Sequence, residues 1–190
     1  MWVAKRGLRV VASLVAVLTG TGILTAGALG DTSAGFPVVG VQVPAPPATV
    51  PPGAIPTPSI SLSSFPAATP TGSSAAASAD VCDVKKNNPH HSGHAPGNVS
   101  FQVSVTCSDG SSALQGQAVL YFNGGEVKNT GGVDQAGTAP GQTRTVNVGV
   151  SCRVGRWQGW GGYWIKFPAG YNPPTESAYG WSNTFDVSSC

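Results

Sequence analysis

Two runs of strictly alternating apolar and polar residues constrain the fold of this chain most strongly. They span Asn98–Cys107 and Thr145–Cys152, and in both the apolar positions are filled mainly by valine. Successive side chains of a β-strand point to opposite faces, so each run predicts a strand with one buried face and one solvated face.

Weaker strand patterns surround these two runs. They lie at Gln117–Phe122, Glu126–Thr130, Tyr163–Phe167 and Trp181–Val187. Pairs such as Asp109-Gly110, Asn123-Gly124 and Pro140-Gly141 separate the patterns and are typical of turns. No window has a sustained helical period, and the 110 residues from Val81 to Cys190 are close to the length of an immunoglobulin domain. We predict an all-β fold, specifically an antiparallel immunoglobulin-like sandwich over residues 81–190.

Residues 1–30 have the features of an export signal. Lys5, Arg6 and Arg9 precede an apolar stretch that starts at Val10, and small residues suited to signal-peptidase cleavage occupy positions 26–30. An uncleaved membrane anchor is the alternative, because roughly 19 residues can span a bilayer. Threonines and glycines at positions 19–22 interrupt the apolar stretch and favour cleavage. We therefore expect a protein that is secreted or associated with the cell wall.

Residues 31–80 read as a disordered linker rich in Pro, Ala, Ser and Thr. No charged residue lies between Asp31 and Asp80, and ten of the sixteen prolines of the chain fall in this segment. Proline interrupts helices and central strands, and the small polar residues of Ala67–Ala79 offer nothing that builds a core. Such a segment is either a stalk through a cell wall or a tail left after cleavage.

All four cysteines, Cys82, Cys107, Cys152 and Cys190, lie in the predicted domain. An even number in an exported protein predicts disulfides, for which three connectivities exist. We favour Cys82–Cys107 and Cys152–Cys190, because each bond ties an end of the domain to one of the two alternating strands. The rival pairing of Cys107 with Cys152 would imitate the inter-sheet bond of antibody domains, but no Trp lies between these two residues.

The charge balance excludes several classes of function. From Asp31 onward there are seven basic and eight acidic residues, a net charge of −1. Nucleic-acid binding and polybasic membrane binding both need clustered positive charge, so we expect neither once the signal is cleaved. No carboxylate pair, G-x-S-x-G motif or free cysteine points to catalysis. We predict a monomer without enzymatic activity or cofactor.

The three histidines, His90, His91 and His94, fall within five residues. Clustered imidazoles suggest a metal, but the Glu of the H-E-x-x-H motif is absent and a zinc site normally takes four ligands. We favour a structural loop in which His90, Ser92 and His94 hydrogen-bond backbone groups ahead of the strand at Val99, and predict no metal site.

The pattern Asn-Asn-Pro-His-x-Ser-x-His-x-Pro-Gly-x-Val, at Asn87–Val99, resembles a motif of small secreted proteins of actinobacteria whose function is unknown. Gly170–Pro174 and the segment from Ser182 to Cys190 resemble the C-terminal pattern of the same family. The resemblance implies a β fold and an extracellular compartment, but no activity. In that pattern His90 and His94 match and His91 is variable, which leaves a three-histidine metal site one ligand short.

Aromatic residues are the main candidates for ligand contact. The candidates are Trp157, Trp160, Tyr163, Trp164, Tyr171 and Trp181. Glycines surround the rings in Arg156–Trp164, so we expect no regular element to bury them all, and we place Trp160 at the exposed end. Exposed rings suit the C–H faces of a polysaccharide or anchor a protein partner. Alternatively, Trp157, Trp164 and Trp181 fill the core.

The function predicted from these residues is a non-enzymatic binding module for polysaccharide of the cell envelope or the extracellular space. The alternative is a secreted interaction or antagonistic factor that contacts a cell-surface protein. A metal-dependent hydrolase is the least favoured function.

Overall fold

A computed structural model describes residues 43–67 and 79–190. The predicted signal peptide, residues 1–30, lies outside the described residues, as do positions 31–42 and 68–78 of the predicted linker. All the described residues belong to one unit of the chain, Val39–Cys190. In this part of the chain no residue is helical, and therefore no helix is long and apolar enough to cross a membrane.

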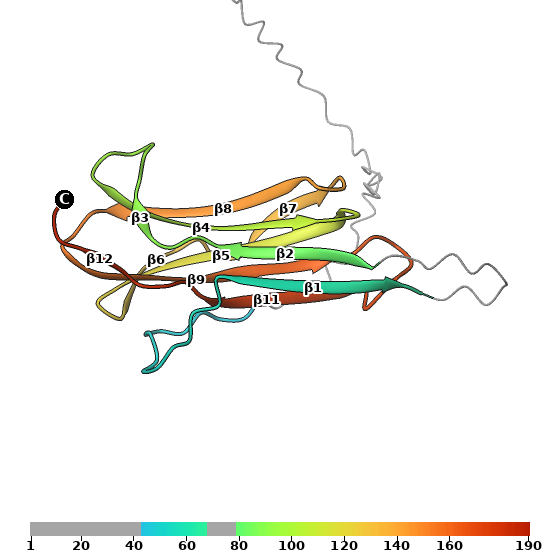
Figure 1. The fold of residues 1–190 in the computed structure, drawn as a ribbon, viewed down its shortest axis with the longest axis horizontal. Helices are drawn as coiled ribbons and strands as arrows, with labels where there is room; N and C mark the ends of the chain where they lie inside the picture. The colour runs from blue at the N-terminus through green and yellow to red at the C-terminus, as the bar shows by residue number, and fades with distance from the viewer. Residues whose placement is uncertain (1–42, 68–78) are drawn as a thin grey trace, which may run out of the picture. The chain divides into compact units, whose positions relative to one another are not determined.

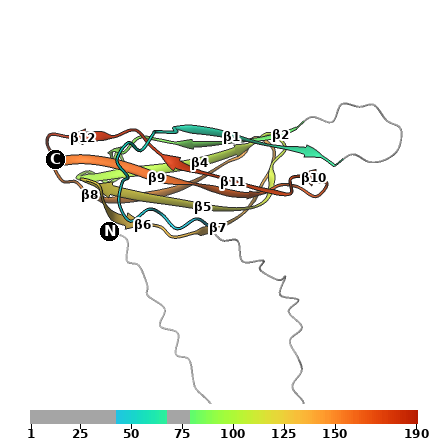
Figure 2. The same ribbon diagram turned by 90° about the horizontal axis from the view of Figure 1, so that it is seen from below.

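Twelve strands form two antiparallel sheets in the described part of the chain (Figures 1 and 2). Sheet 1 contains β1 (Ser59–Pro66), β2 (Asp80–Lys86), β3 (His90–His91), β4 (Asn98–Cys107), β8 (Thr143–Ser151) and β10 (Tyr171–Asn172). Sheet 2 contains β5 (Ser111–Phe122), β6 (Gly125–Asn129), β7 (Val133–Thr138), β9 (Gly155–Lys166), β11 (Thr175–Trp181) and β12 (Phe185–Val187). The prediction of an all-β protein with two antiparallel layers is confirmed.

The strand order follows from a few pairings. In sheet 1 the order is β10-β1-β2-β4-β3, with β8 also paired to β4. In sheet 2 the order is β11-β9-β5-β6, with β12 paired to β9 and β7 paired to β5. The two strongest sequence patterns became β4, with the predicted bounds, and β8, which begins two residues earlier than predicted.

The core lies between the two sheets and is built from alternate residues of their strands. It includes Val99, Phe101, Val103 and Val105 of β4, Leu114, Ala118 and Leu120 of β5, and Trp157, Tyr163 and Ile165 of β9. Gly159 lets the layers approach closely, because a Cβ at this position would overlap the ring of Phe101. The apolar side of each alternating pattern therefore became the inner face of its sheet.

Both favoured disulfides are present, Cys82–Cys107 and Cys152–Cys190. Cys82 and Cys107 are direct partners in the register of β2 and β4. Cys152 follows β8 of sheet 1, and Cys190 follows β12 of sheet 2, so the second bond joins the two layers. In the chain-entropy description, loops of this size contribute about 3–4 kcal/mol each by restricting the unfolded chain.

The linker prediction is wrong for much of the described part of residues 31–80. Ser59–Pro66 forms β1, which pairs with β2 over six residues, and residues 47–57 lie against sheet 2. The prolines misled the prediction because proline prevents strand pairing only where an amide is needed. Positions 59–65 contain none, and Ile60 and Leu62 pack against the core.

The glycine-rich segment Arg156–Trp164 also differs from its prediction. It lies inside β9, a twelve-residue strand in the middle of sheet 2. Glycine weakens an isolated strand, which explains why the sequence showed no strand pattern here. In the folded chain β5 and β11 flank β9 on both sides, and this pairing holds the segment extended.

Candidate functional site

The predicted binding aromatics separate into two sets because β9 alternates between the faces of sheet 2. Trp157 and Tyr163 point inward and have no exposed surface, so they fill the core and cannot touch a ligand without disrupting it. Trp160 and Trp164 point outward, and Trp181 is the register partner of Trp160 on β11. Core packing, the alternative for Trp157, Trp164 and Trp181, is thus confirmed for Trp157 alone, while Tyr163 joins the core unpredicted.

Trp160 is not at an exposed end, as the sequence suggested. It belongs to an outer aromatic cluster formed by Val119, Tyr121, Trp160, Tyr179 and Trp181 on the outer face of sheet 2. The rings of Trp160 and Tyr179 stack at 5.3 Å, and those of Tyr121 and Trp181 lie 5.0 Å apart. Trp160 is only 6% exposed and Trp181 only 8%.

Residues 47–58, here called the strap, cover this cluster; Figure 1 draws the segment in cyan below β11. Val50 and Ala54 pack against the aromatic rings. The Tyr121 hydroxyl donates to the carbonyl of Pro47 at 2.6 Å, and the amide of Thr57 donates to the carbonyl of Trp181 at 2.8 Å. The strap thus crosses the outer face of sheet 2 and is anchored near both ends.

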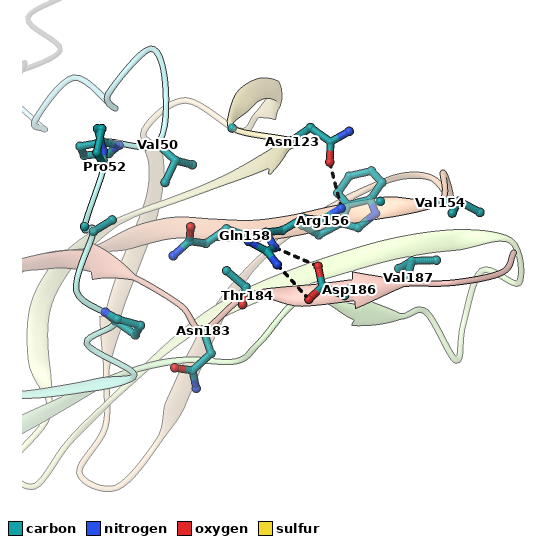
Figure 3. Close-up of a pocket in the computed structure, with 17 residues that line it drawn as sticks. Val50, Pro52, Asn123, Val154, Arg156, Gln158, Asn183, Thr184, Asp186 and Val187 are labelled. Carbon is teal, nitrogen blue, oxygen red and sulfur yellow. Dashed lines mark hydrogen bonds and ion pairs between the residues drawn. The ribbon is translucent and has the colours of Figure 1, made fainter.

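A groove of about 830 Å³ lies between the strap and one end of sheet 2 (Figure 3). This volume is in the range of sites that hold small ligands. The polar side chains that line it are Asn123, Arg156, Gln158, Asn183, Thr184 and Asp186. The apolar lining residues are Val50, Pro51, Pro52, Ala54 and Pro56 of the strap, together with Val154, Trp157 and Val187.

Local geometry explains why the polar side chains meet in this groove. Asn123 and Gly124 have positive φ angles of 47° and 86° and form the tight turn between β5 and β6, as this dipeptide favours. The Asn123 side chain accepts a hydrogen bond from the amide of Arg156 at 3.0 Å. The Gln158 side chain donates to the carbonyl of Ser182 at 3.0 Å, which joins β9 to the loop before β12.

Arg156 and Asp186 form an ion pair, with the guanidinium Nε 2.9 Å from the carboxylate (Figure 3). Their side chains are 66% and 65% exposed. The hydrogen bond to Asp186 raises the pKa of the guanidinium. Because exposed ion pairs contribute little to stability, both groups are available to bind a ligand at small cost to the fold.

The remaining predicted residues lie away from this groove. The Tyr171 hydroxyl donates to the Asp109 carboxylate at 2.7 Å. His90 Nδ1 lies 2.9 Å from the carbonyl of Asn88, and Ser92 accepts from the amide of Ala95, but His90 belongs to the short strand β3 and His94 has no hydrogen-bond partner among the described residues. His94 is exposed.

His91 is placed differently from the other two histidines, because its ring packs edge-on against Phe185 at 5.6 Å. Across residues 43–67 and 79–190, no three His, Cys, Asp or Glu side chains gather as metal ligands would.

Sequence reasoning missed most of the groove. Of the six predicted aromatic contacts only Trp157 borders it, and that ring is fully buried. The Asn123-Gly124 turn and the Ser182-Asn-Thr segment were noticed as patterns, but nothing in the sequence indicated that they meet. No model of a known protein family, no curated protein and no solved structure matches this chain.

Proposed function

We propose that this protein is an exported, non-enzymatic binding module that takes a carbohydrate chain in the groove. The observation that carries the proposal is the composition of the groove, in which six polar side chains face an apolar wall of prolines and valines. Sugar hydroxyls both donate and accept hydrogen bonds, which matches the amides of Asn123, Gln158 and Asn183. The guanidinium of Arg156 and the carboxylate of Asp186 add a donor and an acceptor of higher strength.

Two disulfides support export, since such bonds form and persist in oxidising compartments. They agree with the signal sequence proposed for residues 1–30. We infer a location that is either extracellular or bound to the cell wall, where polysaccharide is abundant.

The residues that line the groove support binding without hydrolysis. Asp186 is the one carboxylate among them, and neither histidine nor cysteine is present. Hydrolysis of a glycosidic bond normally requires a pair of carboxyl groups about 5–10 Å apart. A single carboxylate held by Arg156 is better suited to holding a hydroxyl than to acid–base chemistry.

We further propose that the sandwich is immunoglobulin-like. The neighbours β2-β4-β8 correspond to strands A, B and E of that fold, and β5-β9-β11 correspond to C, F and G. β6 and β7 then take the position of the extra strand beside C. In this assignment the groove lies at one end of the C-F-G sheet.

The test is binding of the exported chain to insoluble peptidoglycan, chitin and cellulose, followed by calorimetry with soluble fragments of whichever glycan retains it. Arg156→Ala should weaken binding more than 10-fold without altering thermal stability. Lys166→Ala, at the exposed opposite end of β9, is the matched control and should bind normally. Retention by none of the three glycans, or equal binding by the two variants, would contradict the proposal.

A protein ligand is the second candidate, favoured by two exposed apolar side chains beside the groove. Ile55 is 77% exposed and Val154 is 60% exposed. Apolar side chains at the border of a concave site are typical anchors for a partner protein. Crosslinking on living cells that captures a discrete protein, and fails with Val154→Asp, would favour this function over carbohydrate binding.

A further inference from the structure

We propose that the outer face of sheet 2 is a binding site for a proline-rich polypeptide with a turn at Pro51–Ala54, which the strap supplies in the isolated chain and which a second copy can supply in its place. This inference concerns the outer aromatic cluster, not the groove, and does not depend on carbohydrate binding.

The first argument is the composition of the face. Tyr121, Trp160 and Trp181 lie on the outside of the sandwich, yet each is at most 8% exposed because the strap covers them. Aromatic side chains commonly form the receptor surface for proline-rich segments. The strap makes a turn on this surface, in which the amide of Ala54 donates to the carbonyl of Pro51 at 3.1 Å and Gly53 has a positive φ of 75°. The strap contains five prolines among twelve residues, at positions 47, 51, 52, 56 and 58.

The second argument is that the strap contacts sheet 2 through apolar packing and backbone hydrogen bonds, as a bound peptide would. Its apolar side chains Val50 and Ala54 meet the rings in the middle of the contact. Two backbone hydrogen bonds join the strap to sheet 2. The amide of Val50 donates to the carbonyl of Gly124 at 2.9 Å, and the amide of Thr57 donates to the carbonyl of Trp181 at 2.8 Å. Proline lacks an amide hydrogen, so its positions in the strap leave no backbone donor unsatisfied.

Tyr121 supplies the polar anchor at the N-terminal end of the contact. Its hydroxyl donates to the carbonyl of Pro47 at 2.6 Å. Burial raises the pKa of this hydroxyl and the charge of Glu126 raises it further, so the group remains a donor at any physiological pH. The contact thus has polar anchors at both ends and apolar side chains between them.

The third argument is that nothing locks the strap in place. None of its residues is fully buried, and Ile55 is 77% exposed. Both disulfides lie outside it, so the sandwich stays cross-linked if the strap leaves. A segment that is half-buried and has no disulfide can be exchanged for an identical one, whereas a core strand cannot.

The test uses a full-length variant in which residues 47–56 are replaced by a Gly/Ser sequence of equal length, so that Thr57 and β1 remain. A synthetic peptide of residues 43–58 is added, and binding is followed by calorimetry and by tryptophan fluorescence. We expect the peptide to bind this variant, with a blue shift of the emission, and to bind the native chain at least 10-fold more weakly. The weaker binding follows because the tethered strap competes at a high effective concentration.

The control is the same peptide with Val50→Asp, which places a charge against the aromatic rings and should not bind. Equal binding of both peptides, or no binding to a variant that retains its disulfides and β-sheet spectrum, would overturn the proposal. Binding of a glycan in place of the peptide would also overturn it and assign the face to carbohydrate.

If the replaced chain does not fold, Val50→Asp in the otherwise native chain provides the test. This variant leaves the aromatic face unchanged but weakens the packing of the resident strap, so the strap competes less well. We expect its affinity for the native peptide to rise several-fold, and an unchanged affinity would contradict the proposal.

Discussion

The two faces of sheet 2 bury the same kinds of side chain by different means. On the inner face, Trp157 and Tyr163 pack against sheet 1 and are completely buried. On the outer face, Trp160 and Trp181 are almost as well buried, but by a proline-rich segment. The comparison teaches that an aromatic side chain with low exposure is not necessarily part of the core. Its role depends on whether the covering element can leave.

The outer face and the groove share one element. Residues from Val50 to Pro56 form the apolar wall of the groove and also cover the outer aromatic cluster. A ligand that fills the groove therefore holds the strap in place, and displacement of the strap removes a wall of the groove. By thermodynamic reciprocity, the two binding events are coupled.

The largest predicted effect separates the inner face from the outer one. Trp157→Ala should lower the free energy of unfolding by about 3–5 kcal/mol, as loss of a large core side chain usually does. It also removes the hydrogen bond from Trp157 Nε1 to the carbonyl of Arg153, at 3.0 Å. Denaturant unfolding measures the loss. A loss smaller than that of Trp160→Ala would break the distinction between the two faces.

Trp160→Ala should have a smaller effect, about 1–3 kcal/mol, because the half-buried strap can settle into part of the space. The variant should also loosen the strap, which loses an aromatic ring against which Val50 and Ala54 pack. Faster proteolysis within residues 47–58, compared with native protein, would show the loosening. Unchanged proteolysis together with a full core-like loss of stability would place Trp160 in the core.

Lys86 is the last residue of β2, and its amide donates to the carbonyl of Pro58 at the end of the strap, at 2.7 Å. Its substitution should change stability in the opposite direction to the two tryptophan variants. Lys86 is 3% exposed, and its ammonium group has no hydrogen-bond partner among the described residues. Burial lowers the pKa of Lys86 from 10.5 to about 8. Between these two pH values the unfolded chain binds more protons than the folded one, so native stability rises with pH in this interval.

Lys86→Met should therefore stabilise the protein by about 1–3 kcal/mol at pH 7, and the gain should shrink towards zero by pH 10.5. Comparison of denaturation curves for native and variant protein cancels the titration of the tyrosines that both contain. Lys166→Met, at an exposed position of β9, is the control and should show no such gain. A gain that stays constant over this pH range would contradict the assignment of a buried charge to Lys86.

The sequence predicted β4 and β8 of the inner sandwich well because each of these strands carries its own signal. The alternation in Asn98–Cys107 identifies β4 without knowledge of its neighbours, and cysteine positions beside the two strong strands pointed to the disulfides that form. β9 was only partly predicted, since its glycines are tolerable only between two paired neighbours.

The outer face and the groove were not predicted because they depend on contacts between distant segments. Proline at positions 47–58 indicates that no regular strand forms, but it does not indicate what the segment touches. Asn123, Arg156 and Asp186 come from three parts of the chain and meet only when β5, β9 and β12 pair in sheet 2. No local pattern marks such a site.

Amide hydrogen exchange of Val50 and Thr57 in the native protein tests the central claim most directly. Both amides donate to sheet 2, so they should exchange at least about 10-fold more slowly than amides of an unstructured chain. They should still exchange faster than the amides of β5 and β9, because the strap opens without unfolding of the sandwich. Exchange as fast as in an unstructured chain, or as slow as in β9, would contradict a strap that covers the aromatic face reversibly.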